Sequence, residues 1–305
     1  MNMFNLLDMS KVPLPDSITV LDYEQKLKEL KEKLLAKHPE FSDALTLESE
    51  PLAIMLEMMA YQALLFDGKV NDAIKGNMLA SATGNDLDAI AARYNLSRQA
   101  ASSNTHEKES DTRFRRRIQM VFEGLNTAGS KQAYQFHALS ADPRVKDVYV
   151  YSPQPCVVEL TVLSHEEGGQ PSIELVEKLR NHFGLLPDGS GPSEEASKVR
   201  PLGDKVSIFP PNVVPYHIEV NLVIAPGPSA SSVEATVKAA LDEYSAQQTL
   251  LGRDISQMGL FSAINKPGVE NGQVVSPSTD ILVSADSVAH CTGMVINASV
   301  RRGDE

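Results

Sequence analysis

The hydrophobic pattern of the chain changes its period part of the way along the sequence. Up to about residue 125, apolar residues recur at the three- and four-residue spacing of a helix face. From about residue 130 onward, short β-rich runs stand between further helical segments. Because strands and helices are mixed without a steady strand–helix–strand rhythm, the pattern favours an α+β fold. We expect a helical N-terminal region followed by mixed α/β subdomains with small sheets.

Changes in composition along the chain predict four parts. They are an N-terminal arm with a bundle helix at 1–40, a helical domain at 41–125, a first α+β subdomain at 126–212 and a second α+β subdomain at 213–305. The polar stretch 97–109 has no apolar periodicity and is the best candidate for a linker. The order of the later segments indicates two strand-plus-helix halves that meet near 204–213.

A narrow apolar stripe marks the first expected helix, which a weak capping signal at Thr19 precedes. Its residues recur at alternating spacings of three and four, and they are Val20, Tyr23, Leu27, Leu30 and Leu34. This is the spacing of a coiled-coil seam, which is narrower than the face a globular helix usually buries. The helix could lie on its own domain or join a bundle that includes other chains. The narrow stripe favours the bundle, so these five residues are candidate contacts with a bundle partner.

A broader apolar face marks the second expected helix, which Pro51 opens. The face consists of Leu52, Met55, Leu56, Met59, Ala60, Ala63 and Leu64. We expect this helix to be buried in the core of the chain, in preference to forming an adaptable methionine-rich binding surface. The helical pattern runs on with a bend near Gly68 until Gly84 ends it, and Asn85 or Asp86 then caps a short helix.

The one basic cluster of the chain lies in the helix that Ser110 caps, and it consists of Arg113, Arg115, Arg116 and Arg117. A nucleic-acid patch would need interleaved aromatics or a recognisable binding fold, and the sequence offers neither. The chain has 40 Asp and Glu against 28 Lys and Arg, a net charge of −12, which disfavours binding to phosphate backbones. We therefore expect Arg113, Arg116 and Arg117 to pair with carboxylates of this chain or of a neighbour.

The clearest strand spans 216–224, where alternate apolar residues point one way and His217, Glu219 and Asn221 point the other. The runs 145–151 and 157–163 are expected to form a hairpin, and Val206 and Ile208 belong to a short strand. A helix capped by Ser172 should present Ile173, Val176, Leu179 and Phe183 on one face. The remaining expected elements are helices at 229–247 and 255–265, strands near 272–276 and 294–300, and a loop at 186–197.

Sequence motifs of catalysis or cofactor binding are absent from the chain. It has no phosphate-binding GxxxxGK[ST], no HExxH, no GxSxG and no metal-ligand spacing among its histidines. Cys156 and Cys291 are isolated, so we expect neither a disulfide framework nor a zinc site, and no cofactor. The alternative is a hydrolase with its acid pair among Glu166, Glu167, Glu194 and Glu195. These carboxylates lie in polar loops, without an apolar pocket to raise a pKa.

No membrane partner is expected, because the most apolar stretch, 51–66, is interrupted by polar residues and is too short to span a bilayer. The start lacks a basic segment followed by an apolar run, so we expect no signal peptide. Two isolated thiols fit a reducing cytoplasm. We therefore expect a protein that is made and kept inside a cell until something releases it.

A set of motifs runs along the chain in one order. They are LASATGNDLD at 79–88, ESD at 109–111, RRI at 116–118, TAG at 127–129, HALSADP at 137–143, VKDV at 145–148, VRPLGD at 199–204 and LGRDI at 251–255. The set strongly resembles the baseplate assembly protein J family of contractile-tailed phages and phage-tail-like bacteriocins. The chain departs from that family in the loop 186–197, which looks enlarged, and in its last five residues, RRGDE.

The resemblance implies a structural subunit of the baseplate wedge in the virion tail, present in the host cytoplasm during assembly. In that family two copies pair within each wedge, and wedges close a ring around the tail hub. Its N-terminal helices join a bundle with a partner wedge protein, and other wedge proteins, including a sheath-initiator-like protein, are further partners. No catalytic residues come with the family. A tail-associated hydrolase and a DNA-binding packaging factor acting through Arg113 to Arg117 remain the alternatives.

Overall fold

The computed structural model of the 305-residue chain describes residues 7–102, 105–126, 128–189, 191–193, 199–226 and 229–301. These residues form two compact units. The helical unit comprises residues up to 98 together with 110–118, and the α+β unit comprises 99–109 together with the chain from 119 onward. Helices precede two small mixed sheets, so the expected α+β class is confirmed. Each unit is described by itself.

In the helical unit, three 3₁₀ turns accompany four α-helices. The turns are η1 (Met9–Lys11), η2 (Pro39–Phe41) and η3 (Ala44–Thr46), and the helices are α1 (Tyr23–Lys37), α2 (Pro51–Gly76), α3 (Gly84–Ala92) and α4 (Asp111–Gln119). Ser110 starts α4, since its hydroxyl accepts from the Arg113 amide at 3.4 Å. A small core joins α3 to α4, with Leu87, Ile90, Phe114 and Ile118 buried together.

Three expectations about the helical unit were wrong. Asp22, not Thr19, caps α1, because the Asp22 carboxylate accepts from the Gln25 amide at 3.0 Å. The second helix continues through Gly68 but ends at Gly76, well before Gly84, which instead opens α3. Thr83 is the N-cap residue of α3, so neither Asn85 nor Asp86 caps it.

The α+β unit begins with a short antiparallel pair, β1 (Ala100–Ser102) and β2 (Thr105–Lys108). The candidate linker at 97–109 therefore contains two short paired strands. Backbone pairing is available to polar residues as well as apolar ones, so a polar composition did not exclude a hairpin here.

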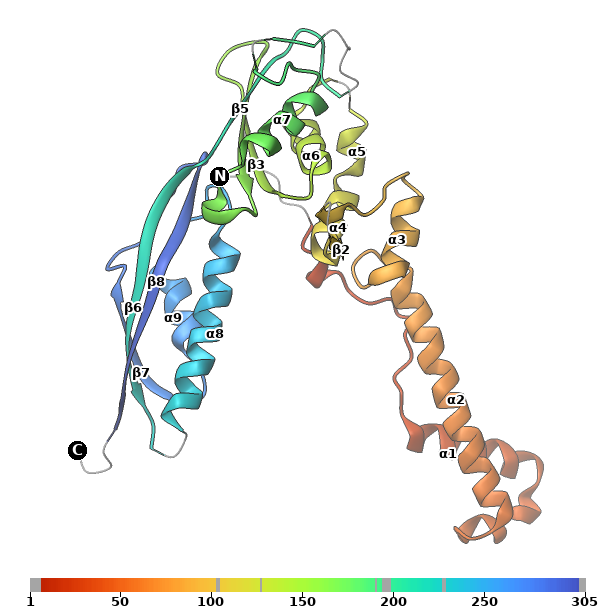
Figure 1. Cartoon of the computed structure of the whole chain (residues 1–305). Coiled ribbons are helices and arrows are strands. Elements are labelled where there is room, and N and C mark those ends of the chain that lie inside the picture. The colour runs from red at the N-terminus through yellow and green to blue at the C-terminus, as the bar shows by residue number, and fades with distance from the viewer. Residues whose placement is uncertain are drawn as a thin grey trace. The chain divides into compact units, whose positions relative to one another are not determined.

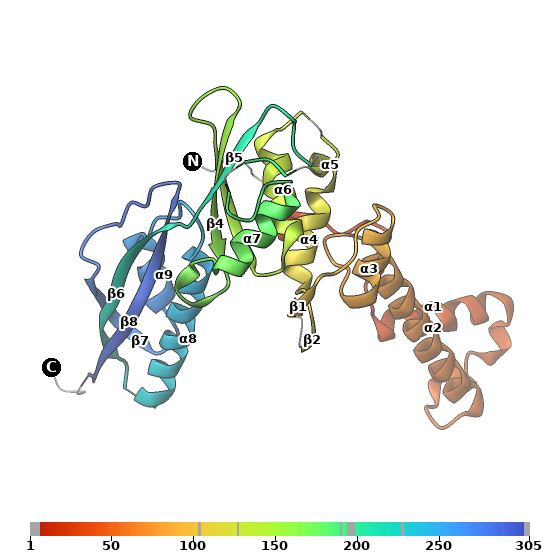
Figure 2. The same cartoon turned by 45° about the horizontal axis from the view of Figure 1, so that its top comes forward.

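The first sheet of this unit has the order β3–β4–β5, with β3 (Val145–Tyr151) antiparallel and β5 (Lys205–Phe209) parallel to β4 (Val157–Ser164). Its helices are α5 (Val121–Gly124), α6 (Lys131–Ala141) and α7 (Ile173–His182), and η4 (Glu167–Gly169) follows β4. Figure 2 shows α6 and α7 beside this sheet. The hairpin and the Ser172 cap are confirmed, since the Ser172 hydroxyl accepts from the Leu175 amide. The expected α7 face was wrong at Ile173, which is exposed, because Leu175 is buried instead.

The second sheet has the order β7–β6–β8, with β6 (Asn212–Ile224) central, β7 (Val269–Ser276) antiparallel and β8 (Ser287–Val300) parallel to it. The helices α8 (Ala230–Gln248) and α9 (Gln257–Ile264) cover one face of this sheet (Figure 1). The alternation expected for 216–224 is confirmed, since Tyr216, Ile218, Val220, Leu222 and Ile224 are all buried. They pack against Val233, Val237 and Leu241 of α8.

Candidate assembly surface

The helices α1 and α2 pack along each other through a few specific contacts. The Lys26 ammonium lies 2.8 Å from the Asp67 carboxylate. Ahead of α1, the Thr19 amide donates to Asn71 Oδ1 at 3.0 Å, and Asn71 Nδ2 donates to the Thr19 carbonyl at 2.8 Å. Asn71 is buried, so this reciprocal pair holds the segment that enters α1 against α2.

Four of the five candidate bundle residues lie on α1, and the fifth does not. Tyr23, Leu27, Leu30 and Leu34 are half-buried, as residues on the packed side of an exposed helix are. Val20 lies before the helix begins and is 84% exposed, so the expected stripe was wrong at its first position. The stripe has a partner helix within this chain, yet no residue of α1 is fully buried. Its contact with a bundle partner stays a prediction.

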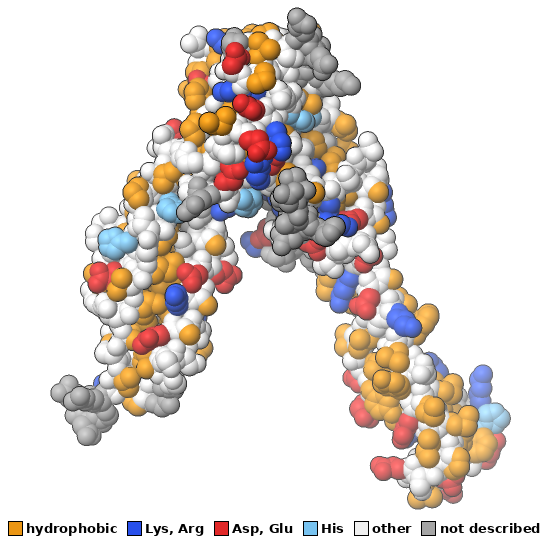
Figure 3. Space-filling view, in the orientation of Figure 1, with side chains coloured by type: hydrophobic (Ala, Val, Ile, Leu, Met, Phe, Trp, Pro, Cys, Tyr) orange, Lys and Arg blue, Asp and Glu red, His pale blue; other side chains and the backbone are white. Residues whose placement is uncertain are grey.

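The outer face of α2 is apolar and exposed. Eight large apolar side chains between Ile54 and Val70 are 38% to 66% exposed, and they are Ile54, Met55, Met58, Met59, Tyr61, Leu65, Phe66 and Val70. We call these eight residues the α2 outer face. Figure 3 shows apolar side chains gathered over the α1 and α2 region. The expectation that this methionine-rich helix packs inside the chain's own core was therefore wrong, because only Ala53, Leu56, Ala60 and Asn71 of α2 are buried.

The geometry of α2 explains why sequence periodicity did not predict an exposed apolar face on this helix. Its buried residues and the α2 outer face point to opposite sides, so α2 is apolar on nearly all sides between Leu52 and Phe66. A helix that is apolar all round is normally buried, and α1 covers only one side of it. Within the outer face, Ile54, Met58, Tyr61 and Leu65 recur at spacings of four, three and four, which suits packing against another helix.

Two arginines of the basic cluster, Arg115 and Arg117, contact groups of the helical unit itself. Arg117 is buried, with its guanidinium 5.8 Å from the Phe114 ring centroid and its Nη1 3.4 Å from the Ser97 carbonyl. Arg115 donates to the carbonyls of Leu79 and Ala82 at 2.8 and 2.7 Å. Arg113 and Arg116 are half-buried. Carboxylate pairing by Arg113, Arg116 and Arg117 stays a prediction.

An arginine that sequence reasoning missed makes the clearest ion pairs of the helical unit. Arg98 lies 2.6 Å from Asp88 and 2.7 Å from Asp111, and so links α3 to α4. Burial lowers the pKa of Arg98, but the hydrogen bonds and attraction of these two carboxylates outweigh it and leave that pKa raised. The hydrogen bond from the Gly84 amide lowers the pKa of Asp111 most. Burial raises that pKa, but the attraction of Arg98 adds to the lowering, so the pKa stays below its ordinary value. Arg98 is an isolated arginine, which no spacing rule singles out.

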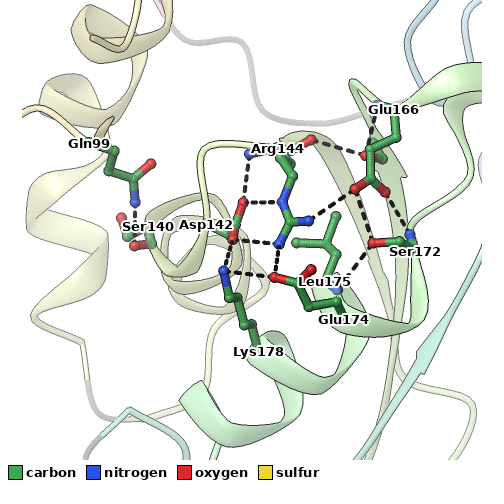
Figure 4. Close-up of polar contacts among 10 residues, drawn as sticks. Gln99, Ser140, Asp142, Arg144, Glu166, Ser172, Glu174, Leu175 and Lys178 are labelled. Carbon is green, nitrogen blue, oxygen red and sulfur yellow. Dashed lines mark hydrogen bonds and ion pairs between the residues drawn. The ribbon is translucent and has the colours of Figure 1, made fainter. Parts of the chain in front are cut away.

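One candidate acid of the hydrolase hypothesis is held in an ion-pair network, which Figure 4 shows. Arg144 makes two hydrogen bonds to Asp142, at 3.0 and 3.1 Å, and one to Glu166 at 3.1 Å. Ser172 donates to Glu166 through its amide at 2.6 Å and its hydroxyl at 3.0 Å. Burial raises the pKa of Glu166, but these hydrogen bonds and Arg144 outweigh it, so the pKa is lowered. A general acid needs the opposite shift.

The other candidate acids of the hydrolase hypothesis, as far as the structure describes them, do not form an acid pair with Glu166. Glu167 begins η4, whereas Glu194 and Glu195 lie outside the described residues. Among the residues that the structure describes, no group of His, Cys, Asp and Glu side chains could hold a metal ion. No helix in the described ranges is long and apolar enough to cross a bilayer. Cys156 and Cys291 are free thiols.

Several residues of the sequence motifs make hydrogen bonds within the α+β unit. Asp204, which ends VRPLGD, accepts from the Tyr134 hydroxyl at 2.7 Å, while the buried Arg200 donates to the Phe183 carbonyl at 2.7 Å. In LGRDI, the Leu251 amide donates to the buried Asp147 of β3 at 3.3 Å. Gly252 has φ +66°, and a Cβ there would meet the Ala285 backbone at 3.1 Å. These motifs therefore hold the loops of the α+β unit in place.

Comparison with known proteins agrees with the motif set. Three family models match in chain order: the Baseplate J-like N-terminal domain at 48–105, the Baseplate J-like central domain at 126–210 and the Baseplate J-like protein C-terminal domain at 216–297. The chain is also similar to "Baseplate protein J" of Escherichia phage P2, with 38% identity over 300 residues, which is 94% of this chain and 96% of that protein. The chain therefore belongs to the baseplate J-like family.

Proposed function

We propose that this protein is a structural subunit of a phage tail baseplate, in which the α2 outer face docks onto helices of other subunits. The observation that carries the proposal is a long helix that is apolar on nearly all sides and covered on only one of them. Membership of the baseplate J-like family, and a relative named for the baseplate, supply the assembly in which that face would be covered.

The composition of the α2 outer face supports docking. Exposed apolar patches of more than a few hundred Å² mark interaction surfaces on soluble proteins. Met55, Met58 and Met59 have flexible, polarisable side chains that adapt to a partner surface. Together with Tyr23, Leu27, Leu30 and Leu34 of α1, this face would place two helices of this chain in a bundle with a partner wedge protein.

Contacts between copies are assigned to the α+β unit in this proposal. Each of its two three-stranded sheets has two edge strands, β3 and β5 in one and β7 and β8 in the other. Edge strands offer unpaired backbone groups that a neighbour can cover. A second copy would pair here within each wedge, and the wedges would close a ring around the tail hub, with a sheath-initiator-like protein among the further partners. The protein would be found in the virion baseplate, and in the host cytoplasm during assembly.

The test is a charge substitution on the α2 outer face. Met58→Asp with Leu65→Asp should leave the isolated chain folded, because both side chains are already exposed, at 65% and 44%. Incorporation into tails should fall at least tenfold, since two buried unpaired carboxylates in a bundle interface cost several kcal/mol. Incorporation is measured by quantifying this chain in purified particles, with electron microscopy of tagged protein to place it.

The matched control exchanges the two residue types at the same positions, as Met58→Leu with Leu65→Met. This swap keeps the apolar composition and nearly the volume, so assembly should proceed as in the wild type. If the aspartate variant assembles as well as the swap variant, the α2 outer face is not a docking surface and the proposal fails.

A further inference from the structure

One face of the β3–β4–β5 sheet carries a groove of about 640 Å³ in the α+β unit. Strand alternation turns Val148 and Leu160 into the core, and places on the opposite face the residues that line this groove. Tyr151 pairs with Glu159, Tyr149 pairs with Thr161, and Thr161 pairs in turn with Phe209. These five side chains are therefore direct neighbours on one surface, and Asp286, ahead of β8, also lines the groove.

The aromatic part of the groove consists of two nearly parallel rings, one of which is packed in place. The rings of Tyr149 and Tyr151 are nearly parallel, with centroids 6.5 Å apart and planes inclined by 9°. Tyr149 packs against the small cluster of Leu163, Leu251 and Val288, which holds its ring in place. Tyr151 is 47% exposed, so its ring is accessible to a planar group lying in the groove.

The charged part of the groove is negative. Glu159 lies beside Tyr151 in the sheet, and Asp286 is positioned by hydrogen bonds from Asn212 Nδ2 and Ser287 Oγ, both at 3.1 Å. The described residues that line the groove include no Lys, Arg or His. Lys205 lies two residue pairs farther along the sheet, beside Val157, and among the described ion pairs none joins it to Glu159. The groove thus offers two carboxylates and aromatic rings to a positive charge.

We propose that this groove binds an arginine side chain of a neighbouring protein in the assembly. A guanidinium is planar, so it can stack on the tyrosine rings while its N–H groups donate to Glu159 and Asp286. A lysine ammonium can use the charge but not the flat ring surface, which is why the geometry favours arginine. The identity of the neighbour rests on the proposed function, whereas binding of the side chain itself does not.

The experiment is a titration of the isolated full chain with N-acetyl-arginine methylamide, followed by methyl NMR at Thr161 and Ala285, which both line the groove. We expect saturable shifts at both methyl groups. The neutral isostere N-acetyl-citrulline methylamide should bind about fivefold more weakly, because it lacks the charge. Since no assembly is involved, failure here is distinct from failure of the docking surface on α2.

Variants assign the effect to the groove. Glu159→Gln and Tyr151→Ala should each weaken binding about threefold to fivefold, whereas Tyr151→Phe keeps the ring and should bind nearly as the wild type does. Glu177→Gln, an exposed carboxylate of α7, is the charge-matched control and should change nothing. Equal binding of the arginine and citrulline compounds, or no saturable shift at either methyl group, would overturn the proposal.

Discussion

The α+β unit and the α1–α2 pair bury their apolar side chains in opposite ways. In the α+β unit, alternate residues of β6 are covered by α8 and α9, and a continuous core results. In the α1–α2 pair, no residue of α1 is buried, and the α2 outer face is open. An isolated helical hairpin with few buried contacts gains little stability from packing. The comparison teaches that the α+β unit is stabilised by its own core, whereas the α1–α2 pair leaves an apolar face open, which the proposed function assigns to contacts with other chains.

The largest effect expected from this contrast comes from truncating a core residue of the α+β unit. Leu222 of β6 is 1% exposed, so Leu222→Ala should lower the free energy of unfolding by about 3 kcal/mol through lost contacts and a cavity. Met59→Ala on the α2 outer face, 54% exposed, should change it by less than about 0.5 kcal/mol. Urea unfolding of the isolated chain measures both. Equal losses would mean that the α2 outer face contributes to a core and would break the comparison.

A second, smaller effect concerns how the stability of the α+β unit depends on pH. His182 of α7 lies beside His137 of α6, with ring centroids 5.8 Å apart, and its Nε2 is buried without a hydrogen bond to any described residue. Burial, and then His137, lower the pKa of His182 to about 4 from an ordinary value of 6.5. The neutral form is thus favoured in the folded state. Its stabilisation is complete above pH 6.5 and is lost as the pH falls towards 4.

The expected loss across that range is about 2 kcal/mol, allowing for partial solvent access. The free energy of unfolding of the α+β unit, measured by urea titrations at several pH values, should fall in acid. His182→Gln should make this free energy depend less on pH. Asp142 and Glu166 should add their losses at the acid end of this range and below it, since their ordinary pKa values are 3.8 and 4.5. Arg144 hydrogen bonds outweigh burial at Asp142, and the Ser172 hydrogen bonds do so at Glu166, so both pKa values are lowered. A pH dependence unchanged in His182→Gln would contradict this account.

The smallest effect concerns the contact that holds α1 to α2. Asn71→Ala removes both hydrogen bonds to Thr19, at a cost of about 1 kcal/mol in local stability. Amide exchange at Thr19 should therefore accelerate about fivefold, while exchange in β6 stays unchanged. Asp72→Ala, one position along on the exposed side, is the control. If Thr19 exchanges at the same rate in both variants, the reciprocal pair does not hold the segment.

The same contrast explains what the sequence could predict. Burial on one face leaves a strict period of two, so the strand from Tyr216 to Ile224 was predictable. The caps at Ser110 and Ser172 were predictable because a short hydroxyl before a helix has a local partner. Four residues of the candidate seam lie on α1, whereas Val20 lies before it, because the cap chosen, Thr19, is three residues ahead of the real one at Asp22. The contact of the seam with a bundle partner stays a prediction.

Two parts of the candidate site were beyond local patterns. The spacing of Met55, Leu56 and Met59 shows an apolar helix, but it does not say whether this chain or another covers each side. Leu56 is buried and the two methionines are open, which only tertiary packing decides. Likewise, the pairing of Arg98 with Asp88 and Asp111 depends on the fold of three separate segments.

The central claim, that the α2 outer face is covered in the assembled baseplate, can be tested by methionine oxidation. Dilute hydrogen peroxide should oxidise Met55, Met58 and Met59 readily in the free chain, because all three are more than half exposed. Mass spectrometry of intact tails treated in the same way should show these three protected at least tenfold, because a dry helix interface excludes the oxidant. Rates measured on acid-dissociated tails, with the chain refolded, control for losses during purification. Equal oxidation of the three methionines in free chain and in tails would contradict the claim.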